Sequence, residues 1–279
     1  MLTKYLRYLR KYFLGYQYDV SICCIIKDEN EYLAEWMNYH LSIGVKHFFI
    51  YDNESSIPVK HTLKNLGLLQ YATVIKIKGK SMQMPAYRQG FKIFRMATKW
   101  MAFIDADEFI VPKSTNGDLP LFLKDYEAYG GLGINWLIFG SSGLKTKQNS
   151  SQILTFTLRS DISFHTNRHI KSIVQTQFVA LVDNPHYAIY KPGYFCVNEN
   201  FQKINGAFSD TSIDKIQINH YYCRSLEEYN EKIKRGRSDD GEIKRRLEDF
   251  MAHDEPSNCV RDTIICELFK SRSNINSIE

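Results

Sequence analysis

The segment at residues 100–112 constrains the fold most, because an apolar run stops at two acids one residue apart and then resumes. Met101 to Ile104 is short, continuous and apolar, which is typical of a strand buried on both faces. Asp105 and Asp107 would emerge where this strand ends, and alternate residues of an extended chain point to the same side. We therefore expect a buried, mostly parallel sheet with an acidic site at one edge.

Two carboxylates at the end of a buried strand suit a hard divalent cation. Mg²⁺ and Mn²⁺ prefer oxygen ligands and are normally held by one or two carboxylates together with substrate phosphates. Three-residue acid patterns are frequent in proteins, however, and a polar strand end is the plain alternative. The Asp-x-Asp pattern therefore indicates a metal and diphosphate site only together with other features of the chain.

Strand and helix patterns alternate before the acids. Strands are expected at residues 20–26, 46–51 and 72–77, and helices at residues 30–43, 59–66 and 85–99. Parallel strands joined by right-handed crossovers bring their carboxyl ends to one edge. Lys27, Asp28 and Asp52 would lie along this edge with the two acids. Residues 19–112 are therefore interpreted as the nucleotide half of an α/β domain.

After Pro112 the pattern changes to short strands separated by turn residues. Strands are expected at residues 133–139, 153–158, 171–176, 178–181, 194–197 and 215–220. Ser225 and Glu228 form a capping box that opens a helix through about Arg235, and further helices are expected at residues 242–251 and 259–270. Residues 113–240 would bear the acceptor, and residues 241–279 would form a helical extension.

Composition narrows the classes of partner. A net charge of +5 suits anionic ligands but is too mild and dispersed to indicate nucleic acid. The six cysteines include no Cys-x-x-Cys pair, and the adjacent Cys23 and Cys24 cannot form a normal framework disulfide within a buried strand. We interpret them as reduced thiols and expect a cytoplasmic protein.

The first 18 residues place bulky apolar and basic side chains at helical spacing. Such a basic amphipathic helix can lie on an anionic membrane surface, so we expect peripheral contact with the inner face of a membrane. A helix packed on its own domain is the alternative. The chain has no 18-residue apolar run and no signal-peptide pattern, so we expect neither a spanning nor an exported protein.

A series of motifs occurs in a fixed order: Ile22–His40, Phe48–Ser56, Ile104–Ile110, Trp136–Gly143, His169–Val174, and Asn219–Tyr229 with Lys232, Arg235 and Gly236. Together these motifs resemble glycosyltransferase family 92 and the related family 2, over roughly residues 20 to 240. The resemblance implies the GT-A fold and inverting transfer of a hexose from a nucleotide sugar. A UDP-hexose is the expected donor, and a glycan or lipid-linked molecule, as in surface polysaccharide synthesis, is the expected acceptor.

The resemblance also implies roles at the donor site. Asp107 would bind Mn²⁺ or Mg²⁺ directly, and Asp105 would contact the metal through water or hold the ribose. A divalent cation is useful there because it stabilises the negative charge that develops on the departing diphosphate. Asp52 would accept a hydrogen bond from the base or ribose, and His220 would be a third metal ligand, with His186 as the alternative.

Other assignments stay open from the sequence. Lys27 and Arg88 are candidates for pairing with phosphate, and Lys27 lies inside a matched motif. An inverting transferase needs a general base, normally a carboxylate, and the candidates are Asp161, Asp239, Asp240 and Glu108.

Trp136 and the turn at residues 139–143 fit a platform for a sugar with flexible backbone beside it, although Trp136 fits a core position equally well. His169 and Lys171 lie in a motif, but their roles cannot be interpreted.

Two other classes of protein share parts of this pattern. Haloacid-dehalogenase phosphatases also have a strand followed by Asp-x-Asp. In these enzymes, however, the motif lies near the start of the domain, and Thr or Val occupies the second position after the second Asp. Here Glu108 and Phe109 follow the motif, and about a hundred residues precede it. A non-catalytic protein that binds nucleotide sugars is the other alternative. The intact acids argue against it, and turnover of a nucleotide sugar would separate the two.

Overall fold

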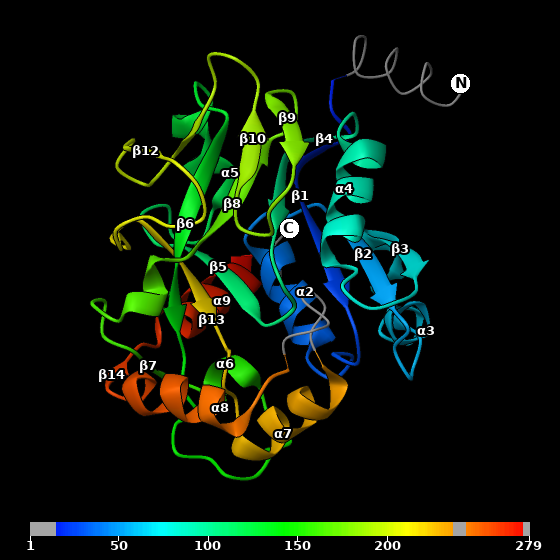
Figure 1. Cartoon of the computed structure of the whole chain (residues 1–279). Coiled ribbons are helices and arrows are strands. Elements are labelled where there is room, and N and C mark those ends of the chain that lie inside the picture. Colours follow the sequence, from blue (N-terminus) through cyan, green and yellow to red (C-terminus); the bar gives the residue numbers. More distant parts are fainter. Residues whose placement is uncertain (1–14, 237–243, 276–279) are drawn as a thin grey trace.

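The computed structural model describes residues 15–236 and 244–275, and within them ten strands form one mixed sheet (Figure 1). The strands follow the spatial order β12 (Lys203–Ile204), β11 (Cys196–Val197), β6 (Gly131–Ile138), β8 (Ile170–Gln175), β4 (Thr98–Phe103), β1 (Tyr18–Ile26), β2 (His47–Asn53) and β3 (Ala72–Ile77). Two more strands, β13 (Ile216–His220) and β5 (Glu108–Pro112), attach to this order through β6.

The first half has the predicted parallel arrangement. Strands β3, β2, β1 and β4 are neighbours and all run parallel. The connecting helices are α2 (Leu33–Ser42), α3 (Val59–Asn65) and α4 (Gln83–Phe94). Gly44 and Gly67 follow α2 and α3 with φ of +102° and +71°, a backbone conformation that glycine adopts without steric cost.

One predicted boundary in this half is wrong. The helix expected at residues 85–99 ends at Phe94, and Thr98 already pairs with Tyr18 as the first residue of β4. Inside the sheet, the Ser21 hydroxyl donates to Thr98 Oγ1 over 2.9 Å. Pairing with β1 therefore overrides the helical spacing of this segment.

The second half is mixed, as predicted, because β8 lies between β4 and β6 and runs antiparallel to both. The smaller elements are α5 (Leu119–Leu123), β9 (Val179–Val182), β10 (Ala188–Tyr190), β7 (Leu158–Arg159), β14 (Val260–Arg261), α7 (Leu226–Arg235), α8 (Leu247–Asp254) and α9 (Ile264–Ile275). Short 3₁₀ turns lie at Leu69–Tyr71, Lys124–Tyr126, His165–Arg168 and Glu255–Ser257. The predicted capping box of Ser225 and Glu228 opens α7.

The strand expected at residues 153–158 is wrong. These residues form the short helix α6 (Gln152–Thr155) followed by β7. Glu35 of α2 accepts the backbone N–H of Gln152 over 2.8 Å, and Ser151 caps the turn. The contact with α2 fixes a helical turn that the apolar pattern alone does not indicate.

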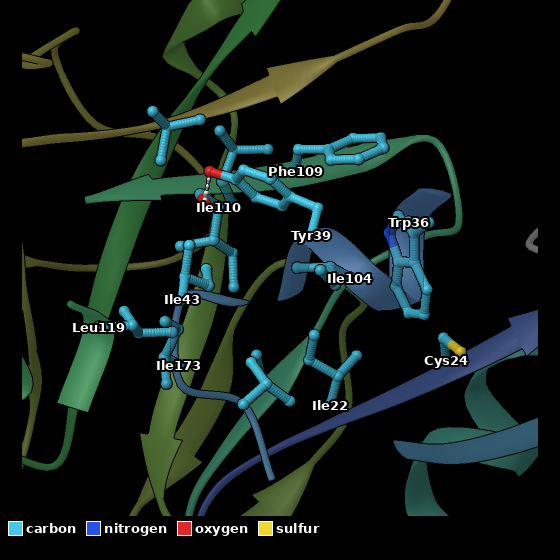
Figure 2. Packing of buried hydrophobic residues seen from close by; sticks show 14 of the residues in the cluster. Ile22, Cys24, Trp36, Tyr39, Ile43, Ile104, Phe109, Ile110, Leu119 and Ile173 are labelled. Carbon is cyan, nitrogen blue, oxygen red and sulfur yellow. Dashed lines mark hydrogen bonds between the residues drawn. The ribbon is translucent and has the colours of Figure 1, made fainter. Parts of the chain in front are cut away.

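The core on one face of the sheet positions the acidic turn. Figure 2 shows Trp36 and Tyr39 of α2 packed beside Ile104, Phe109 and Ile110. The Trp36 indole donates to the carbonyl of Glu108, and the Tyr39 hydroxyl donates to the carbonyl of Ile110, each over 2.8 Å. Because these bonds hold the backbone of β5, the turn that carries the acids is fixed from behind.

The predicted fold class, a mostly parallel α/β sheet with a mixed second half and C-terminal helices, is confirmed. All six cysteines are unpaired. No helix among the described residues is long and apolar enough to cross a membrane. Most of the predicted amphipathic segment, and the base candidates Asp239 and Asp240, lie outside the described residues.

Candidate active site

The acidic turn between β4 and β5 is brought against β13 by strand pairing. Glu108 pairs with His220 in the antiparallel register of β5 and β13. The backbone N–H of Tyr221 donates to the carbonyl of Asp107 over 2.9 Å. As a result, His220 Nε2 lies 3.7 Å from Asp107 Oδ1. The predicted proximity of His220 to Asp107 is therefore present in the structure.

Asp105 is held on both oxygens by three side chains from two elements, α4 and β8. Gln83 and Tyr87 of α4 donate to Oδ1 over 2.9 and 3.2 Å, and Lys171 of β8 donates to Oδ2 over 2.8 Å. Lys171 is buried and also lies 3.5 Å from a carboxylate oxygen of Glu108. Burial opposes the charge of Lys171, but Asp105 and Glu108 raise its pKa above the ordinary value.

Asp107 is held by a second lysine. Lys232 of α7 is buried and donates to Asp107 Oδ2 over 2.7 Å. Burial opposes ionisation of Asp107, yet Lys232, followed by His220 and Arg224, lowers the pKa of this carboxyl well below its ordinary range. Each of the two acids of the motif thus pairs with a lysine of its own.

Two buried polar atoms in the centre have no partner. Glu108 Oε1 and His220 Nδ1 lie 3.9 Å apart, and neither makes a hydrogen bond with the described residues. Burial raises the pKa of Glu108 to about 8 and lowers the pKa of His220 to about 3. The imidazole is therefore neutral at physiological pH, which is the form that binds metal ions.

Asp107 and His220 fit a divalent cation whose other ligands are oxygens of a bound substrate. Among the described residues no group of three or more His, Cys, Asp or Glu side chains is arranged to hold a metal. Asp107 and His220 would supply two ligands, and one or two protein ligands suffice where substrate phosphates complete the site. The unpartnered Nδ1 of His220 faces a carboxylate, which is the usual outer partner of a metal-binding imidazole.

A shallow hollow beside Asp107 is lined by side chains of both charges. Its lining is Asp28, Glu29, Glu31, Tyr32, Lys147, Arg224, Glu228, Glu231, Lys232 and Arg235. Glu29 is paired with Arg224 over 2.7 Å and with Arg235 over 2.5 Å. Burial opposes its ionisation, but these two arginines lower the pKa of Glu29 to about 2. One nitrogen of Arg224, Nη2, is buried with no partner among the described residues.

The residues predicted after β1 and β2 do lie together, in the turns that follow these strands. The backbone N–H of Asp28 donates to Ser55 Oγ, and Asp28 Oδ1 accepts the N–H of Ser56. Lys27, half-buried at the end of β1, has no hydrogen bond or ion pair with the described residues. The sheet edge therefore carries a cation that is available to an anionic ligand.

Asp52 supports the turn that follows β2. It is buried, and its two oxygens accept the backbone N–H groups of Ser55 and Val59, each over 3.1 Å. The second of these bonds caps the start of α3. This geometry favours a structural role over the predicted contact with base or ribose.

Arg88 and His186 also have partners away from the acids. Arg88 forms an exposed ion pair with Asp183 and donates to the carbonyl of Val182, so it is tied to β9 and the residue after it. His186 Nδ1 lies 2.9 Å from the carbonyl of Ile170. The structure therefore favours His220 over His186 as the metal ligand, and it does not place Arg88 with the acids.

Asp161, one of the candidates for the base, lies on an exposed loop. The hydroxyl and backbone N–H of Ser163 donate to its carboxylate and lower its pKa. The preceding residue, Ser160, donates its N–H to the carbonyl of Ile138, which pairs with His220 across β6 and β13. This loop is therefore attached at the strand end where His220 lies.

Trp136 and the turn at residues 139–143, the two parts of the predicted sugar platform, both make contacts within the protein. The Trp136 ring stacks on His169 at 4.9 Å and packs against His220 at 4.5 Å, so imidazoles cover it. The turn at residues 139–143 is not flexible backbone, because Asp254 accepts from Ser141 N–H and Oγ. A Cβ at Gly140 would also meet the carbonyl of Ser257 at 2.5 Å.

Several residues of the centre were not identified from the sequence. They are Gln83, Tyr87, Arg224, Glu29 and the two lysines. The sequence does contain a signal that could have identified the two lysines. Lys171 lies among apolar residues of a buried strand, and Lys232 lies three residues after Tyr229 on the buried face of α7. A lysine at such a position needs a buried acid as its partner.

Comparison with known proteins gives consistent matches. Residues 17–251 match the sequence-family model of glycosyltransferase family 92. A family 92 protein of Ricinus communis is 27% identical over 200 residues, covering 65% of this chain and 33% of that protein. One from Oryza sativa subsp. japonica is 29% identical over 188 residues, covering 65% and 31%. The chain thus spans about one third of the length of these relatives.

Solved structures with similarity to this chain include S. aureus TarS, residues 1–349, with a TM-score of 0.37, 16% identity and coverage of 57% of this chain and 47% of that one. Glucosyl-3-phosphoglycerate synthase from Mycobacterium tuberculosis has a TM-score of 0.30, 13% identity and coverage of 47% of each chain.

Proposed function

This chain belongs to glycosyltransferase family 92, and from this premise we propose that it transfers a hexose from a UDP-sugar, with inversion and with a divalent cation, to a glycan or lipid-linked acceptor. The family assignment confirms the predicted enzyme class and excludes a haloacid-dehalogenase phosphatase. Donor, acceptor and metal are our proposals.

The observation that carries the proposal is the pairing of Asp107 with His220 at the end of β4. Their oxygen and nitrogen lie 3.7 Å apart, at the carboxyl edge of a parallel sheet where α/β folds bind nucleotides. Asp107 and His220 would hold Mn²⁺ or Mg²⁺ together with the diphosphate. The cation, when bound, would neutralise the charge that develops on the leaving diphosphate.

The remaining steps belong to the chain's own residues. Asp105, fixed by Gln83, Tyr87 and Lys171, would accept a hydrogen bond from the ribose or from a metal-bound water. Lys27 is available to a phosphate. In the reaction, the acceptor oxygen bonds to the anomeric carbon while the bond from that carbon to the diphosphate oxygen breaks, and the acceptor proton passes to a base.

Asp161 is our proposed base among the described residues. It is exposed on a loop attached beside His220. Glu108 is unsuitable, because its side chain is fully buried and is turned toward Lys171 and the backbone N–H of Asp105. A base must reach the acceptor hydroxyl.

The experiment is a panel of nucleotide sugars with oligosaccharide acceptors, in which release of nucleoside diphosphate is followed with and without Mn²⁺. We expect release with a UDP-hexose that stops after chelation and returns when Mn²⁺ is added. Transfer at an unchanged rate after exhaustive chelation would contradict the metal role. Binding of UDP-hexose without turnover of any acceptor or of water would instead favour a protein that only binds nucleotide sugars.

A further inference from the structure

The two lysines of the acidic centre differ in what lies beside them. Lys171 lies on a central strand and contacts Asp105, Glu108 and the face of Trp136, so protein groups surround its ammonium. Lys232 lies on α7 and lines the hollow beside Asp107. Of the two lysines, Lys232 is the one that lines this hollow.

The contacts of Lys232 are complete in the absence of ligand. Its ammonium donates to Asp107 Oδ2 over 2.7 Å, to the carbonyl of Tyr222 over 2.9 Å and to the carbonyl of Tyr221 over 3.4 Å. An ammonium has three donors, and these three acceptors use all of them. Asp107 is thus neutralised by a side chain whose four-carbon stem allows its charge to move.

Two arginines line the same hollow as Lys232. Arg224 and Arg235 share Glu29, and one buried nitrogen of Arg224 has no partner among the described residues. A phosphate oxygen is the acceptor that such nitrogens bind most strongly, because both charge and geometry match.

We propose that Lys232 supplies the positive charge at Asp107 in the ligand-free protein and transfers its ammonium to the diphosphate when the donor and its cation bind. This inference rests on the proposed function. A cation held by Asp107 and His220 would share one carboxylate with the ammonium, and two positive groups on one carboxylate repel each other. The diphosphate removes this repulsion by offering the ammonium new acceptors.

The inference predicts that Lys232→Met changes two affinities in opposite directions. Without nucleotide, the variant binds Mn²⁺ more tightly than the parent, by about tenfold, because a competing charge is gone. With saturating Mn²⁺, it binds UDP more weakly, also by about tenfold, which is the loss expected for one charge-assisted hydrogen bond. Calorimetric titration of Mn²⁺ and then of UDP measures both effects without any need for turnover.

Lys147→Met is the matched control. Lys147 lines the same hollow but pairs with Glu31 and Glu231 rather than with the acidic motif, so both affinities stay at the parental values. In an Asp107→Asn background, adding Lys232→Met gives no further gain in Mn²⁺ affinity, because the shared carboxylate is absent. If Lys232→Met does not fold, Lys232→Gln takes its place with the same expectations.

The outcomes separate the inference from the function on which it rests. If the parent requires Mn²⁺ to bind UDP but Lys232→Met behaves as Lys147→Met in both titrations, the inference alone is overturned. If Lys232→Met weakens binding of Mn²⁺ alone, Lys232 supports the metal site instead of competing with it, and the inference is again overturned. If the parent binds UDP equally with and without Mn²⁺, the metal part of the proposed function fails, and the inference fails with it.

Discussion

Glu108 Oε1 and His220 Nδ1 face each other across 3.9 Å in the buried centre, and neither atom has a hydrogen-bond partner among the described residues. The two residues are paired in the register of β5 and β13, so the approach is built into the sheet. A small closure would let Nδ1–H donate to the carboxylate and leave Nε2, on the side of Asp107, as the metal-binding atom. Glu108 is then a positioning residue for His220.

Glu108→Gln should therefore lower the affinity for Mn²⁺ in the presence of UDP by about 10- to 100-fold, the usual cost of losing an outer partner of a metal ligand. Gln has the size of Glu and keeps an oxygen for the backbone N–H of Asp105, and Lys171 keeps Asp105 as its partner, so the replacement should cost little stability. Titration calorimetry measures the affinity, and thermal unfolding measures the stability. A variant that loses thermal stability but keeps its Mn²⁺ affinity would show that Glu108 is structural.

The ion pair of Asp107 and Lys232 links activity to stability. Asp107→Ala should abolish transfer and also destabilise the fold by about 3 kcal/mol, because it leaves the buried Lys232 ammonium without its carboxylate. The double variant Asp107→Ala with Lys232→Met should regain most of this stability but none of the activity. Urea unfolding of the two variants and the parent measures the free energies.

Equal stability of the single and double variants would show that the ammonium is satisfied by the carbonyls of Tyr221 and Tyr222 alone.

Asp161→Asn tests the proposed base. The side chain is exposed, so we expect unchanged thermal stability and unchanged affinity for UDP. Turnover should fall by about 10²- to 10⁴-fold, the contribution typical of a positioned general base. Asp210→Asn is the control, since Asp210 is also exposed and pairs only loosely with Arg168. Steady-state kinetics that give the same kcat for both variants would move the search for the base to Asp239 and Asp240.

The sequence predicts the first half of the fold well because its signals are local. The strand at residues 20–26 is identified by its own apolar run, and the end of α2 by Gly44, without knowledge of any distant residue. The positions of Asp105 and Asp107 at the end of β4 follow from the same kind of signal. The topology of parallel strands then brings them to the edge where Lys27 and Asp28 also lie.

What the sequence does not predict depends on partners far along the chain. Lys171 meets Asp105 because β8 inserts antiparallel between β4 and β6, and Lys232 reaches Asp107 across 125 positions. The turn at Gly140 is held by Ser257 and Asn258 of a later segment. These pairings cannot be predicted from any local pattern. A lysine on an apolar face does indicate that a buried acid lies beside it, but it does not indicate which acid.

The last prediction concerns His40, a residue of α2 that is fully buried against β5. Its Nδ1 lies 2.8 Å from the carbonyl of Trp36, and its Nε2 accepts the backbone N–H of Ile110 over 3.3 Å. Burial lowers the pKa of His40 to about 3, against an ordinary value near 6.5. The unfolded chain therefore takes up this proton first as the pH falls, so stability is present above pH 6.5 and is lost progressively toward pH 3.

Between pH 7 and pH 5 this single group should remove about 2 kcal/mol from the free energy of unfolding. His40→Gln should be less stable than the parent at pH 7, because one of two hydrogen bonds is lost, but its stability should fall less steeply with acid by about that amount. His61→Gln, at an exposed position of α3, should keep the parental slope. Urea unfolding at each pH gives the free energies, and parallel slopes for His40→Gln and the parent would mean that His40 takes up its proton in the folded protein as readily as in the unfolded chain.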